Sequence, residues 1–284
     1  MTAVAGTGRR WARRARRWGW IVAVTVLVLA AVAFVSDLYR MVMGREAFIT
    51  GWLLFGIILA LASYGARKKL RTIPIGRASI WLNLHLYLGF VAGAMLFLHV
   101  GGQWPWGDFE VLLTIILLTV LLSGLGGWIM DRVFAIRLGR RSTEVIYERI
   151  PAHMHRLRQE AEDVMLRVAE ETGSSTLPDF YLLRLAQHFA GPRNRWSHIL
   201  GSARPEVATG REVAAVERYL DDRMKVAIAE LAELIRLKHD LDFHRALQWA
   251  LKFWLFIHVP VTAALLFFIA LHLVLVYAFS GASP

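Results

Sequence analysis

Long apolar runs alternate with short polar segments along much of the chain. Five runs are long enough for a membrane-spanning helix, at residues 18–36, 47–66, 80–100, 111–130 and within 247–279. Several connections between consecutive runs are short, so consecutive helices are expected to be antiparallel neighbours. The pattern therefore predicts an all-α integral membrane bundle of about five transmembrane helices.

Residues 131–245 carry a different pattern, in which apolar positions recur at steps of three and four. One series runs from Met154 to Val168 and another from Val213 to Leu234, which predicts two amphipathic helices. The segment is polar enough to leave the membrane and long enough for a small domain. We therefore expect a cytoplasmic helical insertion before the final membrane helix. The expected parts are a basic N-terminus with the first helix (1–46), bundle helices two to four (47–130), the insertion (131–245), and the final helix with its tail (246–284).

The distribution of charge predicts the orientation of these helices. The formal net charge is +11, and its excess lies in six arginines between residues 9 and 17 and five lysines or arginines between residues 67 and 77. Residues 131–245 are nearly neutral, with 19 Lys and Arg against 18 Asp and Glu. Basic flanks mark the cytoplasmic side of a membrane protein. We expect the N-terminus and residues 131–245 in the cytoplasm and the C-terminus outside the bacterial inner membrane, with no nucleic-acid partner.

The first apolar run has two interpretations. A basic stretch, an apolar run and the small residues Ala31-Val32-Ala33 also fit a secretory signal peptide with its cleavage site. An uncleaved membrane anchor is the interpretation we favour. Cleavage would leave four membrane helices and would not change the orientation of the rest.

Ionisable side chains are rare within the predicted membrane helices. Tyrosines aside, the interiors of the second to fifth helices contain only His85, His99, His258 and His272. Such residues usually mark a pathway or a site, because an ionisable group in hydrocarbon is costly. Each pair on one helix is 14 positions apart, close to four full turns, so its members share one face. The rise of about 21 Å places two sites across most of a hydrocarbon core about 30 Å thick.

The pairing of these histidines predicts the chemistry of the two sites. The third and fifth helices run in the same direction, so His85 is expected to face His258 at the cytoplasmic level and His99 to face His272 at the outer level. Two imidazoles that meet across a bundle can bind the iron of a planar haem from both sides. The chain has no cysteine, so a thioether-attached haem and a cysteine-ligated iron–sulfur cluster are excluded. We predict two non-covalent b-type haems with bis-histidine ligation.

Glycines are expected where a flat haem needs close approach of the backbone. On the second helix Gly51 and Gly65 are also 14 positions apart, and on the fourth helix Gly124 and Gly127 fall toward the cytoplasmic level. We therefore include all four among the haem-binding residues. Ordinary packing of small residues between membrane helices explains the same glycines equally well.

The paired motif resembles the dihaem four-helix bundle of respiratory cytochrome b, in which His-x13-His occurs on two parallel helices. It is also similar to the membrane domain of ferric reductases and NADPH oxidases. Residues 253–258 resemble the helix of that domain that carries haem ligands. The resemblance covers roughly residues 47–130 and 245–279 and implies haem ligands at His85, His99, His258 and His272. The chain lacks the Pro-Glu-Trp-Tyr element of cytochrome b and the nucleotide-binding domain of the oxidases. Neither a quinol site nor a flavin is therefore implied.

The expected function is electron transfer across the inner membrane, as a subunit of an oxidoreductase complex in a respiratory chain. The electrons would pass between redox partner proteins on the two sides, or between one partner and the quinone pool. Because the chain has no flavin or nicotinamide motif, another subunit must donate or accept them, and residues 131–245 are the expected docking surface. Two other classes remain: a transporter that uses the histidines as proton or metal relays, and a structural membrane anchor. A transporter more often has carboxylates in its helices, and an anchor needs no paired ligands.

Overall fold

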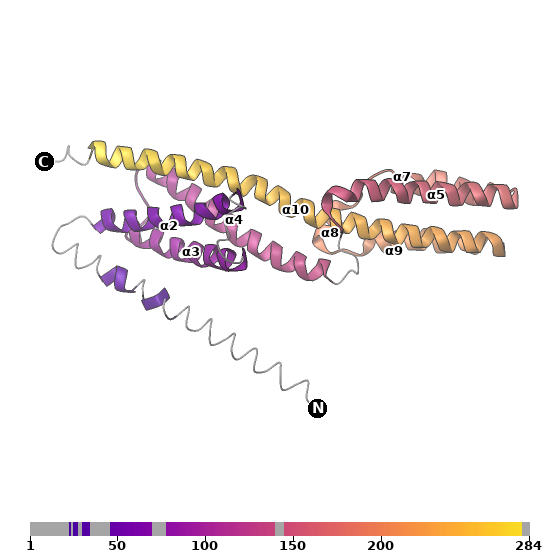
Figure 1. Ribbon diagram of the computed structural model, residues 1–284, viewed down its shortest axis with the longest axis horizontal. Coiled ribbons are helices and arrows are strands. Elements are labelled where there is room, and N and C mark those ends of the chain that lie inside the picture. Colours follow the sequence, from indigo (N-terminus) through magenta and orange to yellow (C-terminus); the bar gives the residue numbers. More distant parts are fainter. Residues whose placement is uncertain are drawn as a thin grey trace, which may run out of the picture. The chain divides into compact units, whose positions relative to one another are not determined.

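The structure is a computed structural model that describes residues 46–69, 78–139 and 145–279, together with residues 23, 25–27 and 30–34. All regular structure in this part of the chain is helical, which confirms the all-α prediction (Figure 1). The first predicted membrane helix, residues 18–36, lies largely outside the described residues. The elements are α2 (Glu46–Lys69), α3 (Ala78–His99), α4 (Asp108–Leu138), a 3-10 turn (Tyr147–Arg149), α5 (Ile150–Thr172), α6 (Thr176–Phe180), a π-helical turn (Tyr181–Leu185), α7 (Ala186–Phe189), α8 (Arg195–Leu200), α9 (Arg204–Glu217) and α10 (Asp222–Phe279).

The described chain forms two compact units. The helical bundle contains residues 46–128 and 257–279, and the second unit contains residues 129–256. Helices α4 and α10 contribute to both units, so no helix ends at the boundaries 130/131 and 245/246 that the change in polarity suggests. A change from apolar to polar side chains alters what surrounds a helix without interrupting its backbone hydrogen bonds.

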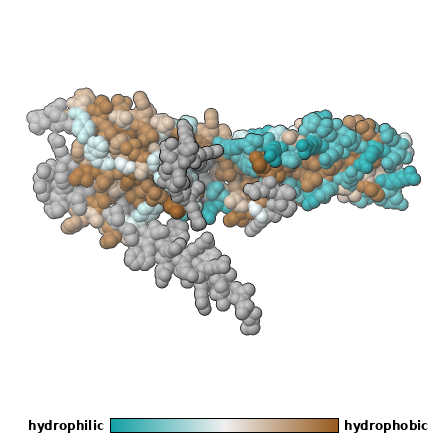
Figure 2. All heavy atoms as spheres, in the orientation of Figure 1, coloured by the Kyte–Doolittle hydropathy of each residue, from teal (hydrophilic) through white to brown (hydrophobic). Residues whose placement is uncertain are grey.

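Helices α2, α3, α4 and α10 are each long and apolar enough to cross a membrane. Large apolar side chains point outward from the bundle, including Phe90, Phe97 and Phe267, each more than 60% exposed. Figure 2 shows this apolar surface over the bundle helices. By the length and composition of its helices, the chain is a membrane protein whose outer face contacts lipid. The buried bundle core draws on all four helices: Leu54, Ile58, Val91, Ala92, Met95, Leu96, Leu117, Leu265 and Ile269.

A tight glycine turn reverses the chain between α3 and α4. Gly101 and Gly102 both have positive φ values, of 64° and 71°, which glycine adopts without steric cost. The N–H of Gly102 donates to the carbonyl oxygen of Phe97 at 3.0 Å, and that of Gly101 donates to Leu98 at 3.1 Å. These bonds satisfy carbonyls at the end of α3 and allow α4 to begin at Asp108.

The second unit has its own apolar core, formed by the long faces of α5 and the first part of α10 together with the short helices between them. Helix α5 covers the predicted series from Met154 to Val168. The prediction of a single helix over residues 213–234 is wrong, because α9 ends at Glu217 and α10 begins at Asp222. The Asp221 carboxylate accepts the backbone N–H of Met224 at 2.8 Å, which caps the new helix. Val213, Leu220 and Met224 all enter the same core, so the apolar spacing does not reveal the break.

A buried ion pair fixes the connector between α7 and α8 to α10. The side chains of Lys238 and Asp242 are almost fully buried, and the Lys238 ammonium donates to the Asp242 carboxylate. The ammonium also donates to the carbonyl oxygen of Gly191 at 2.7 Å. Burial lowers the pKa of Lys238 and raises that of Asp242, and their mutual attraction opposes both shifts.

Removing one member of this pair should loosen the connector. The Lys238→Met variant leaves a buried carboxylate without its cation, at a cost of about 3–5 kcal/mol in local stability. Hydrogen exchange at residues 186–200 should therefore accelerate strongly, and Lys238→Met with Asp242→Leu should recover much of the protection. The matched control is Lys225→Met, which removes an exposed pair with Asp222 and should have little effect. Wild-type exchange in Lys238→Met would show that the pair does not hold the connector.

Three buried histidines lie together beside this ion pair. The ring centroids of His188 and His239 are 4.8 Å apart, and those of His198 and His239 are 6.4 Å apart. Within the described residues, no group of three or more histidines and carboxylates is arranged to hold a metal ion. Burial lowers the pKa of His188 from 6.5 to about 3, with further lowering by Lys238, His239, Arg193 and His198. The lowered pKa keeps His188 neutral at physiological pH, where it packs against the His239 ring.

The depressed pKa of His188 predicts acid sensitivity of the second unit. Protonation favours the unfolded state, so the histidine's full contribution is present above pH 6.5 and is lost as the pH falls toward 3. The loss is about 1.4 kcal/mol per pH unit in this window. The protection factors for hydrogen exchange at residues 186–200, which are corrected for the intrinsic exchange rate at each pH, should fall from pH 6.5 to pH 4.5, and less so in His188→Leu. The His153→Leu control, at an exposed position of α5, should keep the wild-type pH dependence. An equal pH dependence in His188→Leu would contradict this assignment.

Candidate functional site

The four predicted histidines lie on α3 and α10 of the helical bundle, in two pairs whose members are within electrostatic range of each other. His99 of α3 and His272 of α10 line one cavity and are close enough to interact electrostatically. His85 of α3 and His258 of α10 also lie within electrostatic range of each other. The structure thus brings the histidines together in the pairs that the sequence predicts.

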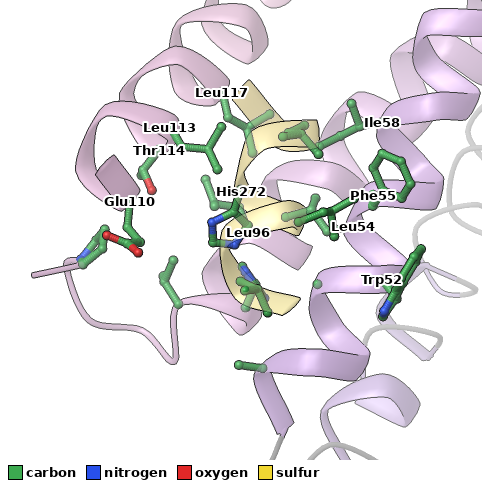
Figure 3. Close-up of a pocket in the computed structure, with 18 of the residues that line it drawn as sticks. Trp52, Leu54, Phe55, Ile58, Leu96, Glu110, Leu113, Thr114, Leu117 and His272 are labelled. Carbon is green, nitrogen blue, oxygen red and sulfur yellow. The ribbon is translucent and has the colours of Figure 1, made fainter. Parts of the chain in front are cut away.

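The cavity at His99 and His272 has a volume of about 690 Å³, which is in the range of small-molecule and cofactor sites. Its wall is mostly apolar, and Glu110 is the charged side chain among the described residues that line it. Figure 3 shows His272 between the residues of α4 and those of α2. The labelled α4 residues are Glu110, Leu113, Thr114 and Leu117, and those of α2 are Trp52, Leu54, Phe55 and Ile58.

Helix α2 holds the His99 imidazole within this cavity. The ring Nδ1 lies 3.2 Å from the Thr50 hydroxyl, and Thr50 is only 2% exposed. A Cβ on Gly51 would lie 2.9 Å from Cε1 of His99, which is closer than side chains tolerate. Because glycine has only a hydrogen atom where other residues have Cβ, Gly51 makes room for the imidazole of His99.

Helix α4 contacts His272 from the other side of the bundle. The Phe109 ring stacks on the imidazole, with centroids 6.1 Å apart and planes 19° apart. The Glu110 carboxylate lies near enough to interact electrostatically with His272. The orientation of this histidine is thus set by an aromatic face and by the first turn of α4.

The site at His85 and His258 is divided between the same helices. The Nδ1 atom of His85 lies 3.2 Å from the carbonyl oxygen of Leu61 on α2, and the Tyr64 ring is 5.1 Å from the imidazole. The Nδ1 atom of His258 lies 2.7 Å from the Ser123 hydroxyl on α4. At both levels, therefore, α2 contacts the histidine of α3 and α4 contacts the histidine of α10.

The four predicted glycines differ in their surroundings. Gly51 contacts His99, and a Cβ on Gly124 would lie 3.6 Å from Cε1 of His258, an ordinary contact distance. A Cβ on Gly65 would meet nothing within 4 Å, and Gly127 is buried in α4. Close approach to a histidine is thus found at Gly51 and Gly124, and the structure gives no such contact for Gly65.

Several residues of these sites are not singled out by the sequence pattern. Thr50 and Phe109 stand among many polar or aromatic residues near helix ends, and the contact of Leu61 is made by its backbone carbonyl. A period of about 3.6 residues places Thr50, Leu54 and Leu61 on neighbouring parts of one face. That periodicity could have identified Thr50 as a polar residue on the face of α2 toward α3.

Comparisons with known protein families, with curated proteins and with solved structures gave no match for this chain.

Adding a methyl group at Gly51 should disturb the His99 contact. The Gly51→Ala variant forces the imidazole or α2 to move, and such overpacking costs about 1–3 kcal/mol. The thermal unfolding midpoint of the purified protein in detergent should therefore fall. The matched control is Gly56→Ala on the same helix, where a Cβ meets nothing within 4 Å and the midpoint should be unchanged or higher. Equal midpoints for the two variants would show that His99 does not require the space at Gly51.

Proposed function

We propose that this protein is a dihaem membrane cytochrome b that transfers electrons across the bacterial inner membrane. The observation that carries the proposal is the meeting of four histidines in two pairs, at two depths of one apolar bundle. Each pair offers two imidazole ligands from α3 and α10. The porphyrin would supply the other four ligands of a six-coordinate iron.

The donor set and the surrounding space fit such a group. No third histidine or carboxylate in the described part of the chain joins either pair to form a metal site of protein ligands alone. A two-histidine set is instead what a bis-histidine haem requires. The cavity at His99 and His272 is apolar and of cofactor size, and Gly51 leaves room for the His99 ring against α2. At the other level, His85 and His258 would hold the second haem, with Gly124 beside His258.

Bound haems would supply one-electron redox centres at two depths of the membrane. The protein's own contribution is to hold the imidazoles, to exclude water with apolar side chains and to set the reduction potentials through burial and hydrogen bonds. His85 with His258, and His99 with His272, would hold the two irons and would leave no ligand position for oxygen or a substrate. This arrangement supports electron transfer rather than bond-making chemistry.

The distribution of charge supports the orientation of the proposed electron path. The basic residues near the N-terminus and between residues 67 and 77 favour a cytoplasmic location for both segments, with residues 131–245 on the same side and the C-terminus outside. The partners would be a cytoplasmic redox protein docked on the second unit, together with an outer redox protein or the quinone pool. A transporter with histidine relays is the alternative that the following experiment separates.

The decisive measurement is a dithionite-reduced minus oxidised spectrum of the purified protein, with haem quantified as the pyridine complex. Wild type should hold two low-spin b-type haems per chain, and His85→Ala and His272→Ala should each lose one of them. The matched control is His155→Ala, at an exposed position of α5, which should retain both. A colourless wild-type protein from cells with ample haem would overturn the cytochrome proposal and favour the transporter.

A further inference from the structure

Two hydroxyl groups, of the buried Thr50 and the half-buried Ser123, occupy corresponding positions at the two levels of the bundle. Thr50 of α2 contacts Nδ1 of His99, and Ser123 of α4 contacts Nδ1 of His258. The two contacts involve different helices, different histidines and different hydroxyl residues, yet they engage the same ring nitrogen. This recurrence directs attention to the other ring nitrogen, Nε2.

Backbone carbonyls offer an acceptor to both hydroxyl groups. The carbonyl oxygen of Val120 lies 2.9 Å from the Ser123 hydroxyl, and a hydroxyl that donates its hydrogen there accepts the Nδ1–H of His258. The Thr50 hydroxyl likewise donates to the carbonyl oxygen of Ala47 at 3.3 Å, and that carbonyl is itself an acceptor for His99. With the hydroxyl hydrogens directed to these carbonyls, both histidines carry their proton on Nδ1. In a neutral imidazole, this leaves the lone pair on Nε2.

From this geometry we infer that Thr50 and Ser123 are positioning residues for the haem ligands, an inference that rests on the proposed function. Each hydroxyl fixes the tautomer and the rotation of its imidazole, so that Nε2 of His99 or His258 is the iron ligand. A hydrogen bond from Nδ1–H also makes the imidazole more basic. A more basic ligand stabilises the ferric state and lowers the reduction potential of that haem.

The His85 and His272 positions differ from these two. The acceptor for His85 is the backbone carbonyl of Leu61, which also places the proton on Nδ1 and which no side-chain substitution removes. His272 has no hydrogen bond to any residue in the described part of the chain and is held by the Phe109 ring. Thr50 and Ser123 thus make the two side-chain hydrogen bonds whose removal by substitution should change the reduction potential of one haem at a time.

The experiment is redox titration, with electron paramagnetic resonance of the oxidised haems, on Thr50→Val and Ser123→Ala. Thr50→Val should raise the potential of the haem that is lost in His272→Ala and shift its g values. Ser123→Ala should do the same to the haem that is lost in His85→Ala. Matched controls on the same helices are Ser63→Ala and Thr119→Val, whose exposed hydroxyls bond only to carbonyls of their own helix, and these should leave both haems unchanged.

Variants that keep a hydroxyl guard against a purely structural explanation. Thr50→Ser and Ser123→Thr should retain both haems with near wild-type potentials, even if Thr50→Val or Ser123→Ala loses a haem altogether. If the hydroxyl-retaining variants shift as much as Thr50→Val and Ser123→Ala, side-chain size explains the effect and the inference is overturned. Two haems with unchanged potentials and g values in all four variants also overturn it, and the cytochrome proposal then stands. A wild-type protein without haem would overturn both the cytochrome proposal and the inference that rests on it.

Discussion

The structure depends on the need of a buried imidazole for a partner at its ring nitrogens. An unsatisfied polar group within an apolar bundle is costly, and three of the four histidines have a hydrogen-bond partner on a neighbouring helix. Helix α2 supplies the Leu61 carbonyl and the Thr50 hydroxyl to α3, and α4 supplies the Ser123 hydroxyl to α10. In each case the contact is made at Nδ1.

The two units meet the cost of buried polar groups in different ways. In the bundle, the imidazoles of His85, His99 and His258 lie among apolar side chains and contact a hydroxyl or carbonyl oxygen of a neighbouring helix. In the second unit, the charged pair of Lys238 and Asp242 is buried together with its hydrogen-bond partner at Gly191. The pKa of the adjacent His188 is lowered first by burial and then by the positive charge of Lys238. A buried charge pair thus attaches a connector in the second unit, whereas buried imidazoles contact neighbouring helices in the bundle.

The sequence predicts the elements of the bundle better than their ends. Hydropathy and helical period are enough to locate four membrane helices and to pair His85 with His258 and His99 with His272, because these depend on spacing along straight helices. The break before Asp222 escapes the pattern, since α9 and α10 present their apolar residues to one core. The Leu61 carbonyl and the stacking of Phe109 escape it too, because they depend on helix rotation and on backbone atoms that carry no sequence signal. Gly51 and Gly65 share a spacing, yet the described structure gives a histidine contact to Gly51 alone.

The division of contacts among the helices has a consequence for biogenesis. Helices α2 and α3 follow each other in the chain, and their hairpin already orients both His85 and His99. His258 lies 159 positions after His99 and is oriented by α4, which is translated long before α10. Each site is thus assembled from an early half and a late half. If the proposed haems bind between the two halves, they can do so only after α10 has joined the earlier helices, so haem loading would follow membrane insertion of the final helix.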